Sequence, residues 1–242
     1  METKRINVWS SPRNISTAFM YAFAQRPDTT VVDEPLYAHY LSKTKTEAVH
    51  PGTPEILESL PHSADTVVQD IIFGHYPTPI VLFKQMTHHL IEIDRYFIRE
   101  TENILLIRDP RAIIKSYSKV VPNPQIEDVG IKMQFELHRW LAEVNKVAAV
   151  IDARLLLLNP KEVLKKLCAQ LGMDFDECML HWEAGPRPED GVWAKYWYDN
   201  VHRSTGFKKY EEKTIELPPN LEALATTCRP YYEYLLQFAL KA

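Results

Sequence analysis

Short apolar runs alternate with longer stretches of helical spacing along most of the chain. Several of these runs are continuously apolar, which is typical of parallel strands that are buried on both faces of a sheet. Polar turns follow most of them, and these turns set the ends of the predicted strands. The expected strands are Ile6–Ser10, Thr30–Glu34, Ile80–Lys84, Ile104–Arg108 and Leu155–Leu158.

Between these runs, apolar residues recur every three to four positions, which predicts helices. Asn159 and Pro160 are typical of an N-cap and a first helical turn, and Gly172 is typical of a helix C-terminus. The alternation predicts an α/β fold, a three-layer sandwich around a central, mainly parallel sheet of about five strands. The expected helices are Ser16–Arg26, Pro54–Leu60, Ala64–Phe73, Arg111–Val120, Asp128–Ile151, Pro160–Leu171, Asp176–Trp182 and Asn220–Leu240.

The length of 242 residues suits a single domain, which we expect to span residues 1–242. The segment 183–214 differs from the rest, since prolines, aromatic and charged residues are concentrated in it. It is too short to build a core of its own. We therefore expect it to be an ordered excursion or lid over the active site.

The composition of the chain limits its expected binding partners and its expected cellular location. Lys and Arg number 28 against 32 Asp and Glu, a net charge of −4 that excludes nucleic acid as a main partner. No apolar run approaches the roughly 20 residues of a membrane helix, and residues 1–5 are expected to enter the first strand without a signal peptide. The sparse cysteines Cys168, Cys178 and Cys228 predict reduced thiols in a cytoplasmic protein. The oligomeric state stays open.

The first polar turn, Ser11–Thr17, follows a strand and precedes a helix. It offers backbone N–H groups, hydroxyls and the Arg13 guanidinium, which are donors suited to a phosphate or sulfate. It lacks the Gly-Lys-Ser/Thr triplet of a Walker A loop. By itself the turn is equally consistent with an ordinary structural connection.

A second strand–turn–helix segment places Arg108 at the end of a strand, where α/β proteins position ligands. Ser116 follows about two helical turns later and is able to face the same crevice. The structural alternative is an ion pair between Arg108 and Asp109.

Together these segments resemble the sulfotransferases that use 3′-phosphoadenosine 5′-phosphosulfate (PAPS). In that family a Pro-Lys/Arg-Ser-Gly-Thr-Thr loop binds the 5′-phosphosulfate, and a strand-end Arg and a later Ser bind the 3′-phosphate. The segment from Asn159 to Gly172 also resembles the family's helix after the last core strand. The resemblance implies a P-loop-like fold, PAPS as co-substrate and no metal. The matching residues are Pro12, Arg13, Asn14, Ile15, Ser16 and Thr17 in the loop, and Arg108 and Ser116 beyond it.

Ile15 stands where the family has glycine. Glycine permits a close backbone approach and a positive φ, whereas a β-branched residue requires an ordinary conformation or is strained. Either the loop holds Ile15 at ordinary angles, or phosphosulfate binding is altered.

Two groups compete for the role of base. Glu34 precedes Pro35 and resembles the Glu of a branch of the family in which that residue is the proposed base. Lys84 matches the Lys of the Lys-Thr-His motif of another branch, but Met86 occupies the position of its His. His88 is the rival base, since an imidazole titrates near neutral pH. The resemblance assigns charge stabilisation to Arg13 and Lys84.

Three late residues, Arg203, Gly206 and Lys208, resemble the family segment that closes over the nucleotide. The alternative for Lys208 is a solvated surface charge. The aromatic residues of Val192–Tyr198 either cover the acceptor or pack against the edge of the sheet.

The resemblance implies transfer of a sulfuryl group from PAPS to a hydroxyl or amine of a small-molecule acceptor, with release of 3′-phosphoadenosine 5′-phosphate (PAP). Glu34, Arg13, Lys84 and His88 are the candidate catalytic residues. One alternative is an ATP-dependent small-molecule kinase on a P-loop-like fold, which the missing Walker triplet disfavours. The other is a non-catalytic nucleotide-binding relative, which Ile15 and Met86 favour.

Overall fold

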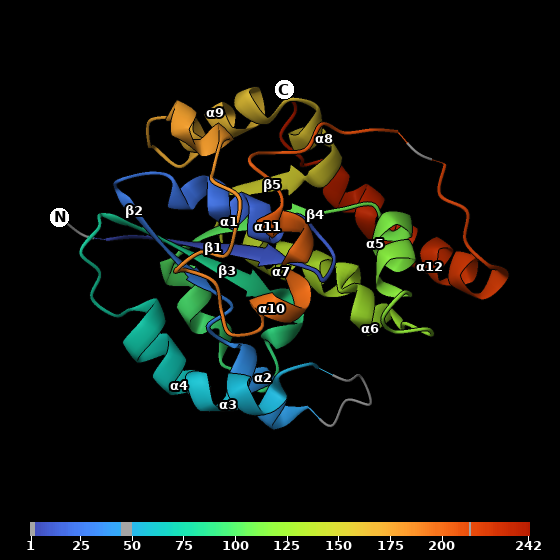
Figure 1. Cartoon of the computed structure of the whole chain (residues 1–242), viewed down its shortest axis with the longest axis horizontal. Coiled ribbons are helices and arrows are strands. Elements are labelled where there is room, and N and C mark those ends of the chain that lie inside the picture. Colours follow the sequence, from blue (N-terminus) through green and yellow to red (C-terminus); the bar gives the residue numbers. More distant parts are fainter. Residues whose placement is uncertain (1–2, 45–49, 213) are drawn as a thin grey trace.

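A twisted five-stranded sheet forms the centre of the molecule, with helices on both of its faces (Figure 1). The structure is a computed structural model that describes residues 3–44, 50–212 and 214–242. The strand order is β2-β3-β1-β4-β5, and all four neighbouring pairs are parallel. The expected α/β sandwich is confirmed. The strands are β1 (Lys4–Ser10), β2 (Thr29–Asp33), β3 (Ile80–Met86), β4 (Glu102–Ile107) and β5 (Ala149–Asp152).

Helices and single helical turns connect the strands and complete the outer layers. The α-helices are α1 (Ser16–Ala24), α2 (Tyr37–Lys43), α3 (Thr53–Ser59), α4 (Ala64–Thr66), α5 (Pro110–Tyr117), α6 (Ile126–Val129), α7 (Ile131–Glu143), α8 (Ala153–Leu158), α9 (Pro160–Gln170), α10 (Ala194–Trp197), α11 (Asp199–His202) and α12 (Pro219–Leu236). The other turns are the π-helical η1 (Val67–Ile72) and the 3-10 helical η2 (Thr87–His89), η3 (Arg95–Glu100) and η4 (Glu177–Leu180).

Alternate residues of the central strands point to opposite faces and build two cores. Trp9 and Phe83 belong to the core that includes residues of α5, α7 and α12. Val8 and Leu82 belong to the core that includes residues of α1 and α9. Burial on both faces explains why these strands have continuously apolar sequences.

The last predicted strand was wrong. Leu155–Leu158 lies in helix α8, and the fifth strand is Ala149–Asp152. The Asp152 side chain accepts a hydrogen bond from the backbone N–H of Leu155 at 3.0 Å, which caps α8. Leu158 is 55% exposed, whereas every residue of β5 is buried. Burial between sheet neighbours, rather than the leucine run, selects the strand.

The long helix expected over Asp128–Ile151 is also shorter than predicted. Gly130, at φ 75°, separates α6 from α7, and α7 ends at Glu143. Asn145 has φ 53° and redirects the chain towards β5. Two further segments that were expected to be regular helices are not. Ala64–Phe73 is a short α-helix followed by the π-helical η1. Asp176–Trp182 contains only the 3-10 helical η4.

The excursion beyond residue 183 lies against the lower helices of Figure 1, where its orange α10 faces the blue α2 and the cyan α3. Trp193 and Tyr198 of the excursion share a small third core with Tyr37 and Ile56. The excursion is therefore held by the domain. Lys213 of this segment lies outside the described residues, as do Met1 and Glu2, on which the expected direct entry into the first strand falls. Within the described residues, no helix is long and apolar enough to cross a membrane.

Candidate active site

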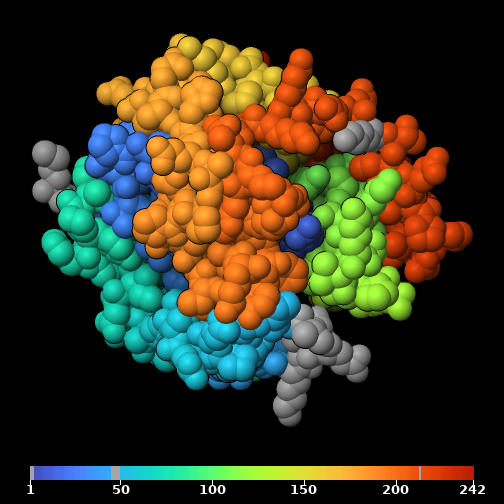
Figure 2. Space-filling view, viewed as in Figure 1, coloured from blue at the N-terminus to red at the C-terminus, as the bar shows by residue number. Residues whose placement is uncertain are grey.

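A cleft of about 530 Å³ opens at the carboxyl ends of β1–β4, beneath the excursion. Figure 2 shows its mouth, where dark-blue atoms of the N-terminal segment are visible between the orange excursion and the green helices. The walls come from segments that are far apart in the sequence. The cleft brings together Arg13, Asn14, Ile15, Ser16, Thr17, Glu34, Lys84, His88, Arg108, Ser116, Gly206 and Lys208.

The first loop resolves the question about Ile15. Ile15 has φ −94° and ψ 24°, angles that need no glycine, and its side chain packs against the core beside α1. The left-handed conformation falls instead on Arg13, at φ 57°. Asn14 holds the turn, since its Nδ2 donates to the carbonyl of Leu106 at 2.9 Å and its Oδ1 accepts from the N–H of Ile15 at 2.8 Å. The unusual backbone angle of the loop therefore falls on Arg13, whose side chain lines the cleft, and not on Ile15.

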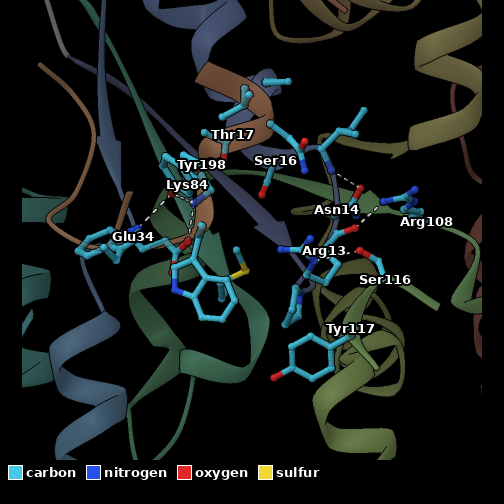
Figure 3. Close-up of a pocket in the computed structure, with 18 of the residues that line it drawn as sticks. Arg13, Asn14, Ser16, Thr17, Glu34, Lys84, Arg108, Ser116, Tyr117 and Tyr198 are labelled. Carbon is cyan, nitrogen blue, oxygen red and sulfur yellow. Dashed lines mark hydrogen bonds and ion pairs between the residues drawn. The ribbon is translucent and has the colours of Figure 1, made fainter. Parts of the chain in front are cut away.

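Two guanidinium groups meet at one end of the cleft (Figure 3). Arg13 Nε donates to Ser116 Oγ at 3.0 Å, and Arg108 Nη1 donates to the carbonyl of Arg13 at 2.6 Å. No ion pair of either arginine with a carboxylate occurs among the described residues. Asp109 caps α5 instead, by accepting from the N–H of Arg111 at 2.8 Å. Among the described residues, this end of the cleft therefore holds two guanidinium groups with no carboxylate in direct contact.

The electrostatics of Arg108 agree with that description. Burial lowers the pKa of its guanidinium, and the positive charge of Arg13 lowers it further. A bound anion would relieve both effects, because it compensates for lost hydration and for the repulsion between the two cations. The donors fit a phosphate or sulfate group.

The opposite end of the cleft holds a buried lysine (Figure 3). Lys84 is 1% exposed, and its Nζ donates to Asp33 Oδ1 at 2.7 Å, to the Tyr198 hydroxyl at 2.7 Å and to Glu34 Oε1. Burial by itself would lower the pKa of Lys84, but the charges of Asp33 and Glu34 outweigh it and raise the pKa well above the usual value. Lys84 therefore stays charged.

Glu34 directly follows β2 at φ 39°, a strained conformation for a residue with a side chain. Its N–H donates to the carbonyl of Lys84 at 2.9 Å, which holds this geometry. Burial raises the pKa of the Glu34 carboxyl, and the charge of Asp33 adds to the rise, whereas Lys84 opposes it. A carboxylate with a raised pKa is a better proton acceptor than an ordinary one.

The two adjacent histidines are held among aromatic rings. His89 is stacked between Tyr37 and Tyr40, with ring centroids 5.0 and 4.8 Å away. His88 meets Tyr40 edge to face at 4.9 Å. Burial, and after it the neighbouring His50, lower the pKa of His88 to about 3. His88 lines the cleft as a neutral imidazole.

Arg203 departs from the expectation. It is exposed, and its guanidinium pairs with Asp199 at 2.6 Å and donates to Asn200 at 2.9 Å, away from the cleft lining. Arg203 and Asp199 are four residues apart around one helical turn, so local geometry favours their pairing. Gly206 and Lys208, from the same segment, do reach the cleft.

Several cleft residues were not predicted from the sequence. The aromatic density of the excursion indicated Trp193, Trp197 and Tyr198 as candidate acceptor contacts, but no local pattern connects these residues with Asp33 or with His50. Among the described residues, no group of three or more His, Cys, Asp and Glu side chains is arranged to hold a metal ion. Lining residues that no sequence pattern indicated include Tyr37, His50, Tyr117, Val120 and Val121.

Solved structures of the same fold are sulfotransferases. The sulfotransferase of Alicyclobacillus acidocaldarius aligns with a TM-score of 0.57 at 12% identity, covering 99% of this chain and 98% of that one. The sulfotransferase domain of the curacin biosynthetic pathway aligns with a TM-score of 0.54 at 17% identity, over 94% of this chain and 98% of that one. Mouse sulfotransferase SULT7A1, complexed with PAP, aligns with a TM-score of 0.52 at 13% identity, over 98% and 91%. At these identities the likeness concerns the fold.

Sequence comparison adds the family. Two curated Arabidopsis thaliana proteins, the branched-chain-amino-acid aminotransferase-like proteins 2 and 1, are 36% and 37% identical over 95% and 97% of this chain. The chain spans only 41% and 42% of their lengths. The family model described as a sulfotransferase domain matches residues 4–237, nearly the whole chain. The chain belongs to the sulfotransferase-domain family.

Proposed function

We propose that this protein transfers a sulfuryl group from PAPS to a hydroxyl or amine of a small-molecule acceptor and releases PAP. One observation carries the proposal. A single cleft joins two guanidinium groups, Arg13 and Arg108, which form no ion pair with any described carboxylate, to a buried carboxyl–ammonium pair, Glu34 and Lys84.

The guanidinium end suits the nucleotide. Arg108 and Ser116 are the donors for the 3′-phosphate, and Arg13 with the backbone of Asn14–Thr17 faces the phosphosulfate. Gly206 and Lys208 of the excursion also line the cleft and are further candidate donors to the nucleotide. The mouse structure of the same fold was solved with PAP, which supports a nucleotide of this kind.

The other end suits the acceptor. The acceptor oxygen or nitrogen attacks sulfur, so that a new S–O or S–N bond forms while the bond from sulfur to the bridging oxygen of PAPS breaks. The acceptor proton passes to the Glu34 carboxylate, and PAP leaves with the bridging oxygen. Arg13 stabilises the charge on the transferring group, as an electrostatic stabiliser of the transition state. Lys84 holds Glu34 in place, and its positive charge opposes the rise in the pKa of the Glu34 carboxyl.

The acceptor lies among aromatic and apolar side chains, which indicates a small and partly apolar molecule. Tyr37, Tyr117 and Trp193 line the cleft together with Met86 and the neutral His88.

Calorimetry with PAP and with AMP tests the nucleotide assignment. AMP lacks the 3′-phosphate, so we expect it to bind at least about tenfold more weakly than PAP, the value of a hydrogen bond to a charged group. If the wild-type protein fails to bind PAP at millimolar concentration, the proposal is lost.

A screen of small alcohols, phenols and amines with PAPS then tests the reaction. On any accepted substrate, Glu34→Gln should abolish turnover and leave PAP affinity unchanged. Tight PAP binding with no transfer to any acceptor would instead favour a non-catalytic nucleotide-binding protein. Magnesium-dependent ATP turnover in place of sulfuryl transfer would favour the kinase alternative.

A further inference from the structure

Asp33 has no role in the proposed reaction, although its carboxylate lies at the centre of the buried cluster. It is 6% exposed at the end of β2. Its Oδ1 accepts from Lys84 Nζ at 2.7 Å. Its Oδ2 accepts from the Tyr198 hydroxyl at 2.7 Å and from the backbone N–H of Gly191 at 3.2 Å. The two oxygens therefore serve different parts of the molecule.

Oδ1 orients the reaction centre. A lysine ammonium has three N–H donors, and those of Lys84 are used by Asp33, Glu34 and Tyr198. Because Lys84 is bound from three sides, it has no freedom to turn away from Glu34. A buried charge with fully satisfied donors is held far more rigidly than a surface one.

Oδ2 holds the excursion. Gly191 and Tyr198 both belong to the segment that covers the cleft, and Tyr198 also accepts from Trp193 Nε1 at 3.1 Å. Tyr198 contacts Lys84 as well, so Asp33, Lys84 and Tyr198 form a closed ring of hydrogen bonds. Movement of the excursion away from Asp33 would open this ring.

We propose that Asp33 is the positioning residue of the reaction centre, which holds Lys84 against Glu34 through one oxygen and couples that arrangement to the seating of residues 183–212 through the other. The catalytic consequence rests on the proposed function, whereas the coupling itself is a property of the protein alone. The pKa of Glu34 then shows whether the hydrogen-bond ring of Asp33, Lys84 and Tyr198 is closed.

Glu34 is faced by charged or titratable groups from β2, β3, η2 and α2 and from the turn between α10 and α11. Asp33 raises its pKa and Lys84 lowers it. His89 Nε2 lies 4.0 Å from Glu34 Oε2, and burial keeps the pKa of His89 well below the usual value, so this imidazole is neutral. Burial raises the pKa of Tyr37 and of Tyr198, so both phenols are neutral too. The only negative charge that acts on Glu34 from this set is that of Asp33.

Asp33→Asn removes that charge but keeps a side-chain oxygen that accepts from Lys84, so the ring is retained while Glu34 becomes the remaining carboxylate at Lys84 Nζ. The loss of this close like charge lowers the pKa of Glu34 by roughly one unit. Carboxyl ¹³C NMR measures this midpoint without any substrate, and Glu34→Gln assigns the resonance. The proposal is overturned if Asp33→Asn leaves the midpoint unchanged.

Two Tyr→Phe variants separate the ring from the rest of the excursion. Tyr198→Phe opens the ring, so it should move the Glu34 midpoint and speed proteolysis of the excursion. Tyr21→Phe removes another bond to the excursion, from the Tyr21 hydroxyl to Asp190 Oδ1 at 2.6 Å, without touching Lys84. It should speed proteolysis and leave the midpoint in place. The coupling would be contradicted if both variants shifted the Glu34 midpoint equally, or if Tyr198→Phe did not shift it. Tyr198→Phe also provides the test if Asp33→Asn does not fold.

If the protein transfers sulfuryl groups, the acid limb of the kcat profile in Asp33→Asn should move to lower pH together with the NMR midpoint, while PAP affinity stays within twofold. An unchanged Glu34 midpoint in Asp33→Asn would refute the positioning role. Absence of transfer in the wild-type protein would refute the proposed function and leave the NMR result standing.

Discussion

Arg108 donates from Nη1 to the backbone carbonyl of Arg13 at 2.6 Å, and so binds the end of β4 to the first loop. The carbonyl that Arg108 contacts belongs to the residue with φ 57°, so the contact also supports the strained turn. Arg108 thus has two functions in one side chain, since it shapes the loop and adds positive charge to the cleft.

Arg108→Ala should weaken PAP binding at least about tenfold, because a charge-assisted hydrogen bond is worth roughly 1.5–3 kcal/mol. Arg203→Ala is the matched control, since Arg203 is an exposed arginine paired with Asp199 outside the cleft. Calorimetry with PAP should find the control unchanged. Similar losses in the two variants would show that the effect is a general one of net charge.

Arg13 combines an unfavourable backbone angle with a functional side chain, so its glycine and alanine variants should differ in stability while both lose binding. Glycine adopts φ 57° without the steric cost that alanine bears. Arg13→Gly should therefore be more stable than Arg13→Ala by about 1 kcal/mol, while both variants lose PAP affinity. Urea unfolding measures the first effect, and an alanine variant as stable as the glycine variant would show that the loop carries no strain.

His88 should remain neutral throughout the range in which an ordinary histidine titrates. Burial and the neighbouring His50 lower its pKa to about 3. ¹⁵N NMR of the imidazole should therefore show no protonation between about pH 5 and 8, a range centred near the ordinary histidine pKa. A midpoint above 5 would restore His88 as a general base in competition with Glu34.

Glu34 should make stability fall as pH rises. Its pKa is raised on folding, so its contribution is complete below the pKa of the unfolded chain and is lost as the pH rises through the folded value. Glu34→Gln cannot ionise, so its stability relative to wild type should be greater at pH 8 than at pH 4.5. Denaturant unfolding at both pH values measures this, with the exposed Glu100→Gln as control; a constant difference would contradict the burial effect.

Lys84 should stabilise the fold as well as the site. Lys84→Met leaves Asp33 and Glu34 buried without their cation, which costs roughly 3–5 kcal/mol for a buried ion pair. Adding Asp33→Asn removes one of the two stranded charges and should recover part of that loss. Guanidinium unfolding of both variants provides the measurement, and a double variant no more stable than Lys84→Met would contradict this account.

Most of the sheet was predictable because buried parallel strands have continuous apolar sequences that end in polar turns. Ile104–Arg108 and β4 differ by one or two residues at each end. Leu155–Leu158 misled the prediction, since a run of four apolar residues has no period that distinguishes a strand from a helix. The structure shows that Leu155–Leu158 is helical, because Ala149–Asp152 pairs with β4 as the strand and Asp152 then caps the next helix.

The site, like the sheet, was predictable only in part from the sequence. The chemistry of Arg13, Arg108 and Ser116 follows from local order, since a polar turn between a strand and a helix points its donors at one edge of the sheet. No local pattern pairs Lys84 with Asp33, which lies 51 residues away, or with Tyr198, 114 residues away. Local sequence determines which groups stand at the strand ends. Only the packing of distant segments decides which charges are buried together, and that burial sets which group holds the proton.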